Sequence, residues 1–396
     1  MADPITIRVV VHNTSGVGGT YTTPFWAGFH DNSFDLFDLG SAASAGLEAL
    51  AEDGNFAPIN AELTAADSDA QNLVIAGAAG PIAPQERGAA TIEVDGETNG
   101  YFSVAGMVLP SNDAFVGNGT ALKLFDDAGN FLGAQTLVFQ GNDVYDAGTE
   151  VNTELDAAFL NQTGPNTGVD ENGVVSLHAG FNGSSGNPIG DGDQNILGGT
   201  GAFGDPIDVM AADFTLDGAQ IATVHINAAI THTGTAASEL FIGGVEDDLV
   251  SAGRGRDVVL GGDGWDDING GRGADILFGE DGEDLLLGGG GRDRLFGDNG
   301  DDVLNGGAGR DQLTGGAGAD HFVFAGVRGR DVVRDFDADQ DDVIVIDVAG
   351  IDSFADVQAI ARDTGRGVAI DLSDESRVVI LGEDLANLSD SDFLFL

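Results

Sequence analysis

GGDGWDDIN at residues 261–269 and GGRGADILF at residues 270–278 follow one template, which runs without a break through residues 243–323. The template has nine places, and this stretch holds nine consecutive copies of it. Its sixth place is always aspartate: Asp248, Asp257, Asp266, Asp275, Asp284, Asp293, Asp302, Asp311 and Asp320. Its eighth place is always apolar: Val250, Val259, Ile268, Leu277, Leu286, Leu295, Leu304, Leu313 and Phe322. A disordered Gly- and Asp-rich linker has no reason to keep this period, which therefore indicates a repeated structural unit.

Each place in the unit has a physical reason. Glycines allow tight turns with a positive φ and leave backbone carbonyl oxygens uncovered. The aspartate adds a hard anionic oxygen, the ligand type that calcium prefers. The last three places predict a short strand whose apolar residue points inward. One unit cannot bury that residue alone, so units must stack to form a continuous apolar column.

The template G-G-x-G-x-D-x-U-x, in which U is apolar, resembles the calcium-binding nonapeptide of the RTX (hemolysin-type) proteins. The resemblance implies a parallel β-roll in which two units make one coil and calcium ions bind between coils. Nine units would then hold about seven ions, and we expect the segment to be disordered without calcium. Glu246, Ala252, Glu280 and Asp298 replace template glycines, and binding is expected to be least secure at the amino-terminal end of the roll.

The chain of 396 residues is strongly acidic, with 66 acidic and 15 basic residues and a formal charge of −51. This charge repels nucleic acids and anionic lipids, so we exclude both as direct partners. The chain has no cysteine, and calcium would replace disulfides as the cross-link of a secreted domain. No run of residues suits a transmembrane segment, and the amino terminus lacks the features of a signal peptide.

Residues 1–235 contain short apolar segments separated by turn residues, which predicts an antiparallel β-sandwich. SAASAGLEALAEDG at residues 41–54 predicts one helix, and DDAGN at residues 126–130 predicts a hairpin turn. A linker is expected at residues 231–238. The successive motifs FWAGFHDNSFDLFDLGSAASAGLEALAEDG, VLPSNDAFVGN and VYDAGTE resemble those of the spondin amino-terminal domain. The animal members of that family are extracellular-matrix proteins with an antiparallel β-sandwich and a bound calcium ion, and bacterial proteins carry the domain too.

The spondin resemblance implies one further calcium site in this amino-terminal domain. Carried over by motif, PSND supplies Asp113, and DAGTE supplies Asp146 and Glu150. Acidic groups on sandwich loops can converge on one hard cation. Glu150 stands where the family usually has aspartate. In the alternative interpretation, Asp113 and Asp146 only cap turns.

Residues 326–396 lose the glycine period and alternate apolar and polar residues like strands. The segment resembles the capping and secretion region of RTX exoproteins. This resemblance implies that the type I secretion machinery exports an unfolded chain, which folds on meeting external calcium. We therefore predict an all-β protein: a spondin-like sandwich (1–235), a calcium-bound parallel β-roll (236–325) and a small β-rich carboxyl-terminal cap (326–396).

The favoured function is a secreted or surface-associated calcium-binding protein rather than an enzyme. Its spondin-like head would recognise an extracellular glycan or a matrix or surface protein. No HExxH, G-x-S-x-G or P-loop motif occurs in the sequence. Two alternatives stay open: a self-assembling extracellular matrix or surface-layer component, and an extracellular hydrolase of unrecognised type.

Overall fold

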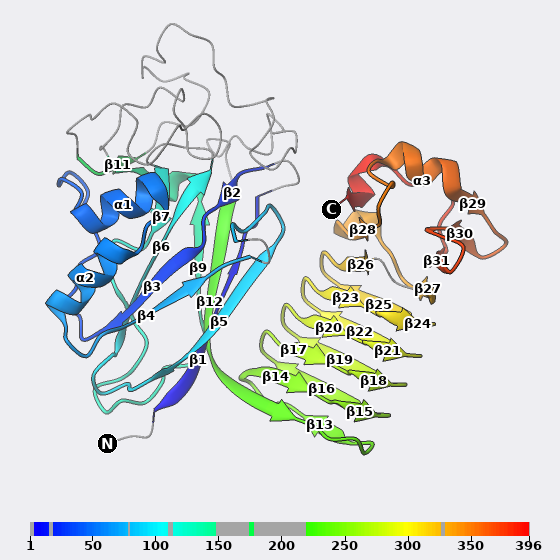
Figure 1. Cartoon of the computed structure of the whole chain (residues 1–396), viewed down its shortest axis with the longest axis horizontal. Helices are drawn as coiled ribbons and strands as arrows, with labels where there is room; N and C mark the ends of the chain where they lie inside the picture. Colours follow the sequence, from blue (N-terminus) through cyan, green and yellow to red (C-terminus); the bar gives the residue numbers. More distant parts are fainter. Residues whose placement is uncertain are drawn as a thin grey trace, which may run out of the picture. The chain divides into compact units, whose positions relative to one another are not determined.

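The computed structural model describes residues 4–15, 19–77, 80–109, 114–147, 174–177, 219–325 and 329–395 (Figure 1). Backbone contacts divide the chain into two compact units, Met1–Ala228 and Ala229–Leu396. The first is called the head below. The second contains the coiled repeats, called the roll, and is considered separately.

The head contains two antiparallel sheets, as the sequence predicts. In one sheet, β1 (Ile5–His12) lies between β5 (Arg87–Val94) and β12 (Gln220–Thr233), and β9 (Gln135–Gln140) also pairs with β12. The strands of the other sheet are β2 (Tyr21–Thr22), β3 (Phe25–His30), β4 (Gln71–Ile75), β6 (Tyr101–Leu109), β7 (Ala114–Gly117), β8 (Leu122–Lys123), β10 (Val144–Asp146) and β11 (Ser176–Leu177). Side chains from both sheets, including Val9, Phe29 and Val224, form one buried core, as expected for packed sheets.

Two helices and a second apolar cluster complete the head. Helix α1 (Ala45–Asp53) begins at Ser44, whose side chain accepts a hydrogen bond from Leu47 N, and it ends at Gly54 in the left-handed conformation. This confirms the predicted helix. Helix α2 (Ala57–Ala66) was not predicted from the sequence. The cluster includes Trp26, Leu47 and Leu63, and a 3₁₀ turn, η1 (Gly141–Asp143), precedes β10.

The roll consists of stacked parallel strands in two sheets (Figure 1). One sheet contains the end of β12, then β14 (Asp247–Ser251), β17 (Asp267–Asn269), β20 (Leu285–Leu287), β23 (Val303–Asn305), β26 (His321–Ala325), β28 (Val343–Asp347) and β32 (Phe393–Phe395). The other contains β13 (Leu240–Ile242), β16 (Val258–Asp263), β19 (Ile276–Asp281), β22 (Arg294–Asn299), β25 (Gln312–Ala317), β27 (Gly329–Val333) and β31 (Ser376–Leu381). The two-residue strands β15 (Arg254–Gly255), β18 (Arg272–Gly273), β21 (Gly290–Gly291) and β24 (Ala308–Gly309) stack along the turns.

The register confirms that two units make one coil. Val250 pairs with Ile268, and Ile268 pairs with Leu286, each step being two nine-residue units. The eighth-place residues form the roll's core and are almost fully buried, between 0% and 4% exposed. Stacking therefore buries what a single unit would leave in water, as the repeat logic requires.

The coil continues beyond Val323, where the nine-residue period ends. Phe322 pairs with Ile344 in β28, and Leu313 pairs with Val333 in β27. The terminal cap adds α3 (Phe354–Ile360), β29 (Ala361–Asp363), β30 (Gly367–Ile370) and the 3₁₀ turns η2 (Ala338–Gln340) and η3 (Asp390–Asp392). Its core continues that of the roll through residues such as Val357 and Phe393.

The predicted linker at residues 231–238 is partly wrong. β12 extends to Thr233, and Thr231 pairs with Leu249 in β14. The reason is local, because the β-branched residues Ile230, Thr231 and Thr233 favour extended backbone. In the described part of the chain, no helix has the length and apolar character that a bilayer crossing needs.

Candidate metal-binding sites

The sixth-place aspartates form two ladders, one on each set of turns. All nine are buried, at 0% or 1% exposure. In both ladders the backbone N–H of one aspartate donates to Oδ1 of the aspartate one coil further on, with N···O distances of 2.7–3.0 Å. One carboxylate oxygen of each acceptor is therefore held in a fixed direction by the backbone.

The second carboxylate oxygen has a different environment. Oδ2 is buried and accepts no hydrogen bond from any described residue in Asp257, Asp266, Asp275, Asp293, Asp311 and Asp320. A buried acceptor without a donor is costly, and more so when it carries charge. A cation that these oxygens coordinate would remove that cost.

Backbone carbonyl oxygens border the same space. A Cβ atom added to Gly288 would lie 3.0 Å from Oδ2 of Asp293 and 2.7 Å from the carbonyl oxygen of Gly306 in the next coil. A Cβ atom on Gly270 would lie 3.0 Å from Oδ2 of Asp275 and from the carbonyl oxygen of Gly288. Only glycine leaves these oxygens uncovered. Uncovered carbonyl and carboxylate oxygens together match the oxygen ligands of calcium, so the residues present fit this ion.

Burial changes the protonation of these carboxyls. It raises the pKa of Asp266 to about 8, with the neighbouring Asp284 carboxylate adding to the effect. Burial likewise raises the pKa of Asp293 and of Asp320 to about 7. Without a cation, a large share of these groups would hold a proton at neutral pH. A bound divalent ion would displace those protons, because it favours the ionised form.

The ladders extend further than the sequence predicts. Asp311 N donates to Oδ1 of Asp331 at 2.9 Å, and Asp320 N donates to Oδ1 of Asp342 at 3.0 Å. Burial raises the pKa of Asp331 to about 7 and of Asp342 to about 6. Both residues keep the short pattern of aspartate followed two places later by an apolar residue, Val333 and Ile344. That pattern could have identified them once the strict period was relaxed.

The first aspartate differs from the rest. Oδ1 of Asp248 lies 2.8 Å from Nε2 of His232, and Oδ2 accepts a hydrogen bond from Gly244 N at 3.1 Å. Both oxygens are thus engaged by protein groups. This is the end of the roll where the sequence predicts the least secure binding.

The predicted head site lies only partly within the described residues. Asp146 is buried at the end of β10, where it pairs in register with Ala114 and Ser176. Asp113 and Glu150 fall outside the described residues. Among the described residues, no three His, Asp or Glu side chains gather as a metal cluster. The roll sites would therefore depend on backbone oxygens beside each aspartate.

The head also has an open cavity of about 380 Å³. Its lining includes Asp31, Glu97, Tyr101 and Lys123, the only lysine in the chain. The predicted hairpin turn forms one wall and is confirmed by the antiparallel bridge between Phe125 and Phe131.

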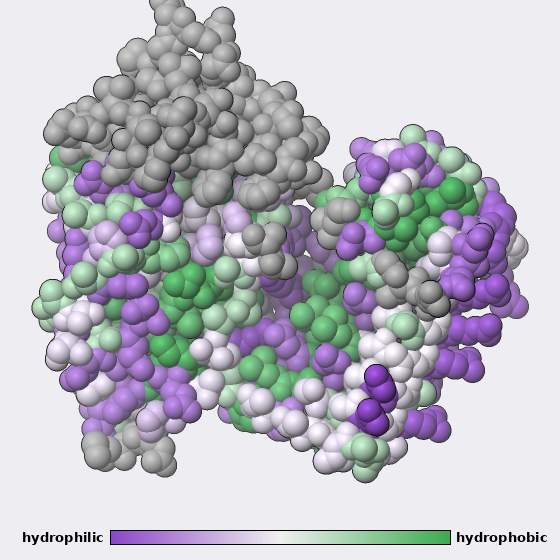
Figure 2. Space-filling model, viewed as in Figure 1, coloured by the Kyte–Doolittle hydropathy of each residue, from purple (hydrophilic) through white to green (hydrophobic). Residues whose placement is uncertain are grey.

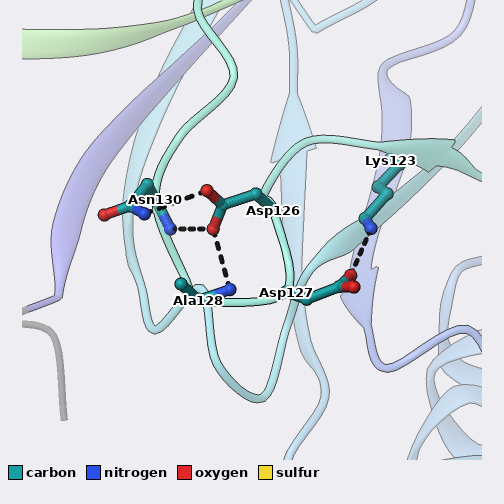
Figure 3. A network of polar contacts seen from close by, with 5 residues as sticks. All are labelled: Lys123, Asp126, Asp127, Ala128 and Asn130. Carbon is teal, nitrogen blue, oxygen red and sulfur yellow. Dashed lines mark hydrogen bonds and ion pairs between the residues drawn. The ribbon is translucent and has the colours of Figure 1, made fainter.

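Asp126 fixes this hairpin turn. Its Oδ1 accepts hydrogen bonds from the backbone N–H of Ala128 and Asn130, and Lys123 pairs with Asp127 at 2.6 Å (Figure 3). The cavity therefore has a defined wall that is mostly acidic, with the positively charged Lys123 side chain beside it.

Two family models match different parts of the chain. Residues 20–167 match the Spondin_N family model. Four segments, 233–264, 242–277, 260–295 and 296–326, match the RTX calcium-binding nonapeptide repeat. No curated protein matches the chain.

Among solved structures, the crystal structure of the extracellular lipase LipA from Serratia marcescens is similar over 43% of this chain. The match covers 40% of the lipase, at 18% sequence identity and a TM-score of 0.23. A likeness of this size carries no argument about activity.

Proposed function

We propose, for a chain that joins a spondin domain to RTX calcium-binding repeats, that calcium ions fold the roll and that the head recognises an extracellular ligand. RTX repeats are calcium-binding motifs typical of secreted proteins. Beyond this, the proposal describes a non-enzymatic adhesion or matrix-recognition protein. The roll would serve export through the type I secretion machinery and folding outside the cell.

The row of buried Oδ2 atoms carries the first half of the proposal. These Oδ2 atoms accept no hydrogen bond from the described residues in Asp257, Asp266, Asp275, Asp293, Asp311 and Asp320. In Asp266, Asp275 and Asp293, a glycine lies beside Oδ2, and a Cβ atom added there would also meet a glycine carbonyl oxygen of the next coil. Calcium modules outside cells typically bind at roughly 0.1–1 mM. An ion at about ten times its dissociation constant stabilises by roughly 1.4 kcal/mol. About seven such ions would contribute on the order of 10 kcal/mol, comparable to the stability of a whole domain.

Trypsin offers a direct test on the full chain, because Arg254, Arg272, Arg292 and Arg310 lie in the turns of the roll. We expect cleavage at these sites in chelator and protection in millimolar calcium, with the products identified by mass spectrometry. Equal protection in both conditions would contradict calcium-dependent folding.

Calorimetry tests the assigned ligands. Asp275→Asn with Asp293→Asn removes two carboxylates and keeps their shape, so the number of ions bound should fall. Asp263→Asn is the matched control, because Asp263 is exposed and outside the sixth place. An unchanged stoichiometry in the double variant would reject these residues as ligands.

The recognition half of the proposal is supported by the spondin match and by the cavity beside the hairpin turn. A glycan array and a panel of matrix proteins would identify the ligand class. Lys123→Gln and Tyr101→Ala alter the cavity lining, and both should weaken binding. Leu132→Ala is the control, because Leu132 is exposed and is absent from the lining.

Ligand binding that is insensitive to both cavity variants would place recognition elsewhere in the head. The assignment as a non-enzyme stays a prediction. A panel of ester, peptide and glycoside substrates tests it, and turnover that survives purification would overturn it.

A further inference from the structure

The charged side chains of the roll are sorted between its two sets of turns. Four of the nine units, those that begin at residues 252, 270, 288 and 306, hold every arginine of the repeats. In these units the sixth-place aspartate is the only acidic residue. Five arginines at their third and fifth places, all exposed, define the Arg edge: Arg254, Arg256, Arg272, Arg292 and Arg310. Figure 2 shows hydrophilic side chains projecting from the edge where β15, β18, β21 and β24 lie in Figure 1.

The other five units form the opposite set of turns and contain no lysine or arginine. Their turns carry acidic residues besides the sixth-place aspartates. We define the acid edge by Asp263, Glu280, Asp281 and Asp298. These residues stack in register from coil to coil, Asp263 beside Asp281 and Glu280 beside Asp298. Like charges directly opposite each other on paired strands repel, so the acid edge has a surplus of charge that its own coils do not neutralise.

Two of these acids occupy positions that the backbone reserves for glycine. Glu280 and Asp298 have φ values of +78° and +75°, whereas the same place in neighbouring units is held by Gly262 and Gly316. A left-handed backbone is unfavourable for residues other than glycine. The acid edge therefore keeps its carboxylates against local preference.

The acidic residues form a stripe rather than a metal cluster. Within the described ranges, no three acidic or histidine side chains converge as a metal site would require. None of the five arginines on the opposite edge forms an ion pair with a described residue. On the acid edge, Asp281 accepts a hydrogen bond from the neutral Asn299 side chain, which leaves its charge in place.

We propose that the Arg edge of one copy docks against the acid edge of a second copy. Both edges repeat once per coil, with a spacing of about 4.8 Å between paired strands. Aligning one arginine with one carboxylate therefore brings the following coils into alignment as well. Because the two surfaces differ, the contact leaves one free edge on each copy and adds further copies in an open row.

The proposal depends on the proposed function in one respect, since calcium must fold the roll before the edges exist. The net charge of −51 opposes association at low salt. Screening shortens this repulsion to about 8 Å at physiological ionic strength, while the contacting pairs are closer than that. We therefore expect association to be strongest at intermediate salt, and weaker at about 0.01 M and at about 1 M.

Sedimentation velocity on the full chain in millimolar calcium tests the docking. One variant reverses the Arg edge with Arg272→Glu and Arg292→Glu. A second reverses the acid edge with Asp263→Lys and Asp281→Lys. Each variant alone should associate about tenfold more weakly than the native chain, because exposed pairs contribute modestly and reversal turns attraction into repulsion. An equimolar mixture should restore association, because each variant then meets a complementary edge.

Calcium stoichiometry and trypsin protection show whether each variant has a folded roll. A native chain that binds calcium fully but stays monomeric at every concentration would overturn the docking and leave the proposed function intact. Failure of the mixture to restore association, with both variants folded, would also overturn it. Retention of the monomeric native chain on an immobilised polyuronate, lost with Arg272→Glu and Arg292→Glu, would show instead that the Arg edge binds an anionic polymer.

Discussion

The head and the roll are both built from strands, yet they bury different groups. In the head, two antiparallel sheets enclose large side chains such as Phe29, Phe102 and Val104. The buried polar atoms without a hydrogen bond that the structure records there belong to neutral groups, the hydroxyls of Thr14, Thr20 and Thr22 and the amide oxygen of Gln71.

In the roll, one apolar residue per nine is buried together with one aspartate. The corresponding polar atoms without a hydrogen bond are carboxylate oxygens. Burying an unpaired charge costs far more than burying an unpaired hydroxyl. Two regions of similar strand content therefore differ in what they leave unsatisfied, neutral groups in the head and carboxylate oxygens in the roll, and we propose that calcium satisfies the second set.

Removing calcium should produce the largest difference in stability between the head and the roll. We expect chelator to destabilise the roll by on the order of 10 kcal/mol and to leave the head folded. The two tryptophans report on them separately, because Trp26 lies in the head core and Trp265 in the roll. In Trp265→Phe the remaining fluorescence should be insensitive to chelator. A head ion at Asp146 would shift head unfolding by only about 1.4 kcal/mol at ten times its dissociation constant.

Truncating a buried leucine sharpens the same contrast. Leu286→Ala in the roll and Leu47→Ala in helix α1 both remove a fully buried side chain, at a cost of about 2–5 kcal/mol each. The roll variant should need more calcium to fold, since the ions must offset the lost packing. The head variant should unfold at a lower urea concentration without changing the calcium midpoint. If both variants needed the same calcium concentration for half-folding of the roll, the proposed difference between the roll and the head would be wrong.

Without calcium, the stability of the folded roll should fall as pH rises. Burial raises the pKa of Asp266 to about 8 and of Asp293 to about 7. The pKa of an aspartate in the unfolded chain is about 3.9. Between these values the folded roll binds more protons than the unfolded chain, so its stability falls as pH rises.

Each such group contributes roughly 1.4 kcal/mol per pH unit within that window. Circular dichroism in chelator should therefore show more roll structure at pH 5 than at pH 8. In saturating calcium the ions replace the protons, so the difference should disappear. Greater order at pH 8 in chelator would contradict the assignment.

The smallest effect concerns backbone strain. Glu280→Gly relieves a positive φ at a place where neighbouring units have glycine, and should stabilise the calcium-loaded roll by about 1 kcal/mol. Glu283→Gly is the matched control, since Glu283 is not among the residues with a positive φ. Urea unfolding in calcium measures both. Destabilisation by Glu280→Gly would show that its side chain contributes more than its backbone costs.

Periodicity predicted the roll because every place in the unit has one physical task, so the ladders and the core column followed directly from the sequence. It missed Asp331 and Asp342 because their turns are longer. The ladder steps from Asp311 and Asp320 span 20 and 22 residues instead of 18. A search for a strict nine-residue period therefore ends at Val323, whereas the aspartate ladders continue to Asp331 and Asp342.

Non-repetitive parts of the chain were harder to predict. The Ser44 and Gly54 caps allow helix α1 to be predicted, whereas the N-cap residue of α2, Phe56, makes no side-chain cap hydrogen bond. The β-branched residues Thr231 and Thr233 favour extended backbone, but composition alone does not reveal that this segment pairs with β14. For the head site, the motifs predicted three acids, and the described residues contain only Asp146.

Strand β12 gives the roll a direction of growth. Its first residues pair with β1 in the head, while Ala229–Thr233 pair with β14, the first strand of the repeats. Starting a coil from nothing is the slow step for any stacked array, because backbone freedom is lost before neighbouring contacts form. Ala229–Thr233 provide a strand on which the first repeat can pair. We therefore expect the coils to assemble in sequence from this strand toward the carboxyl-terminal cap.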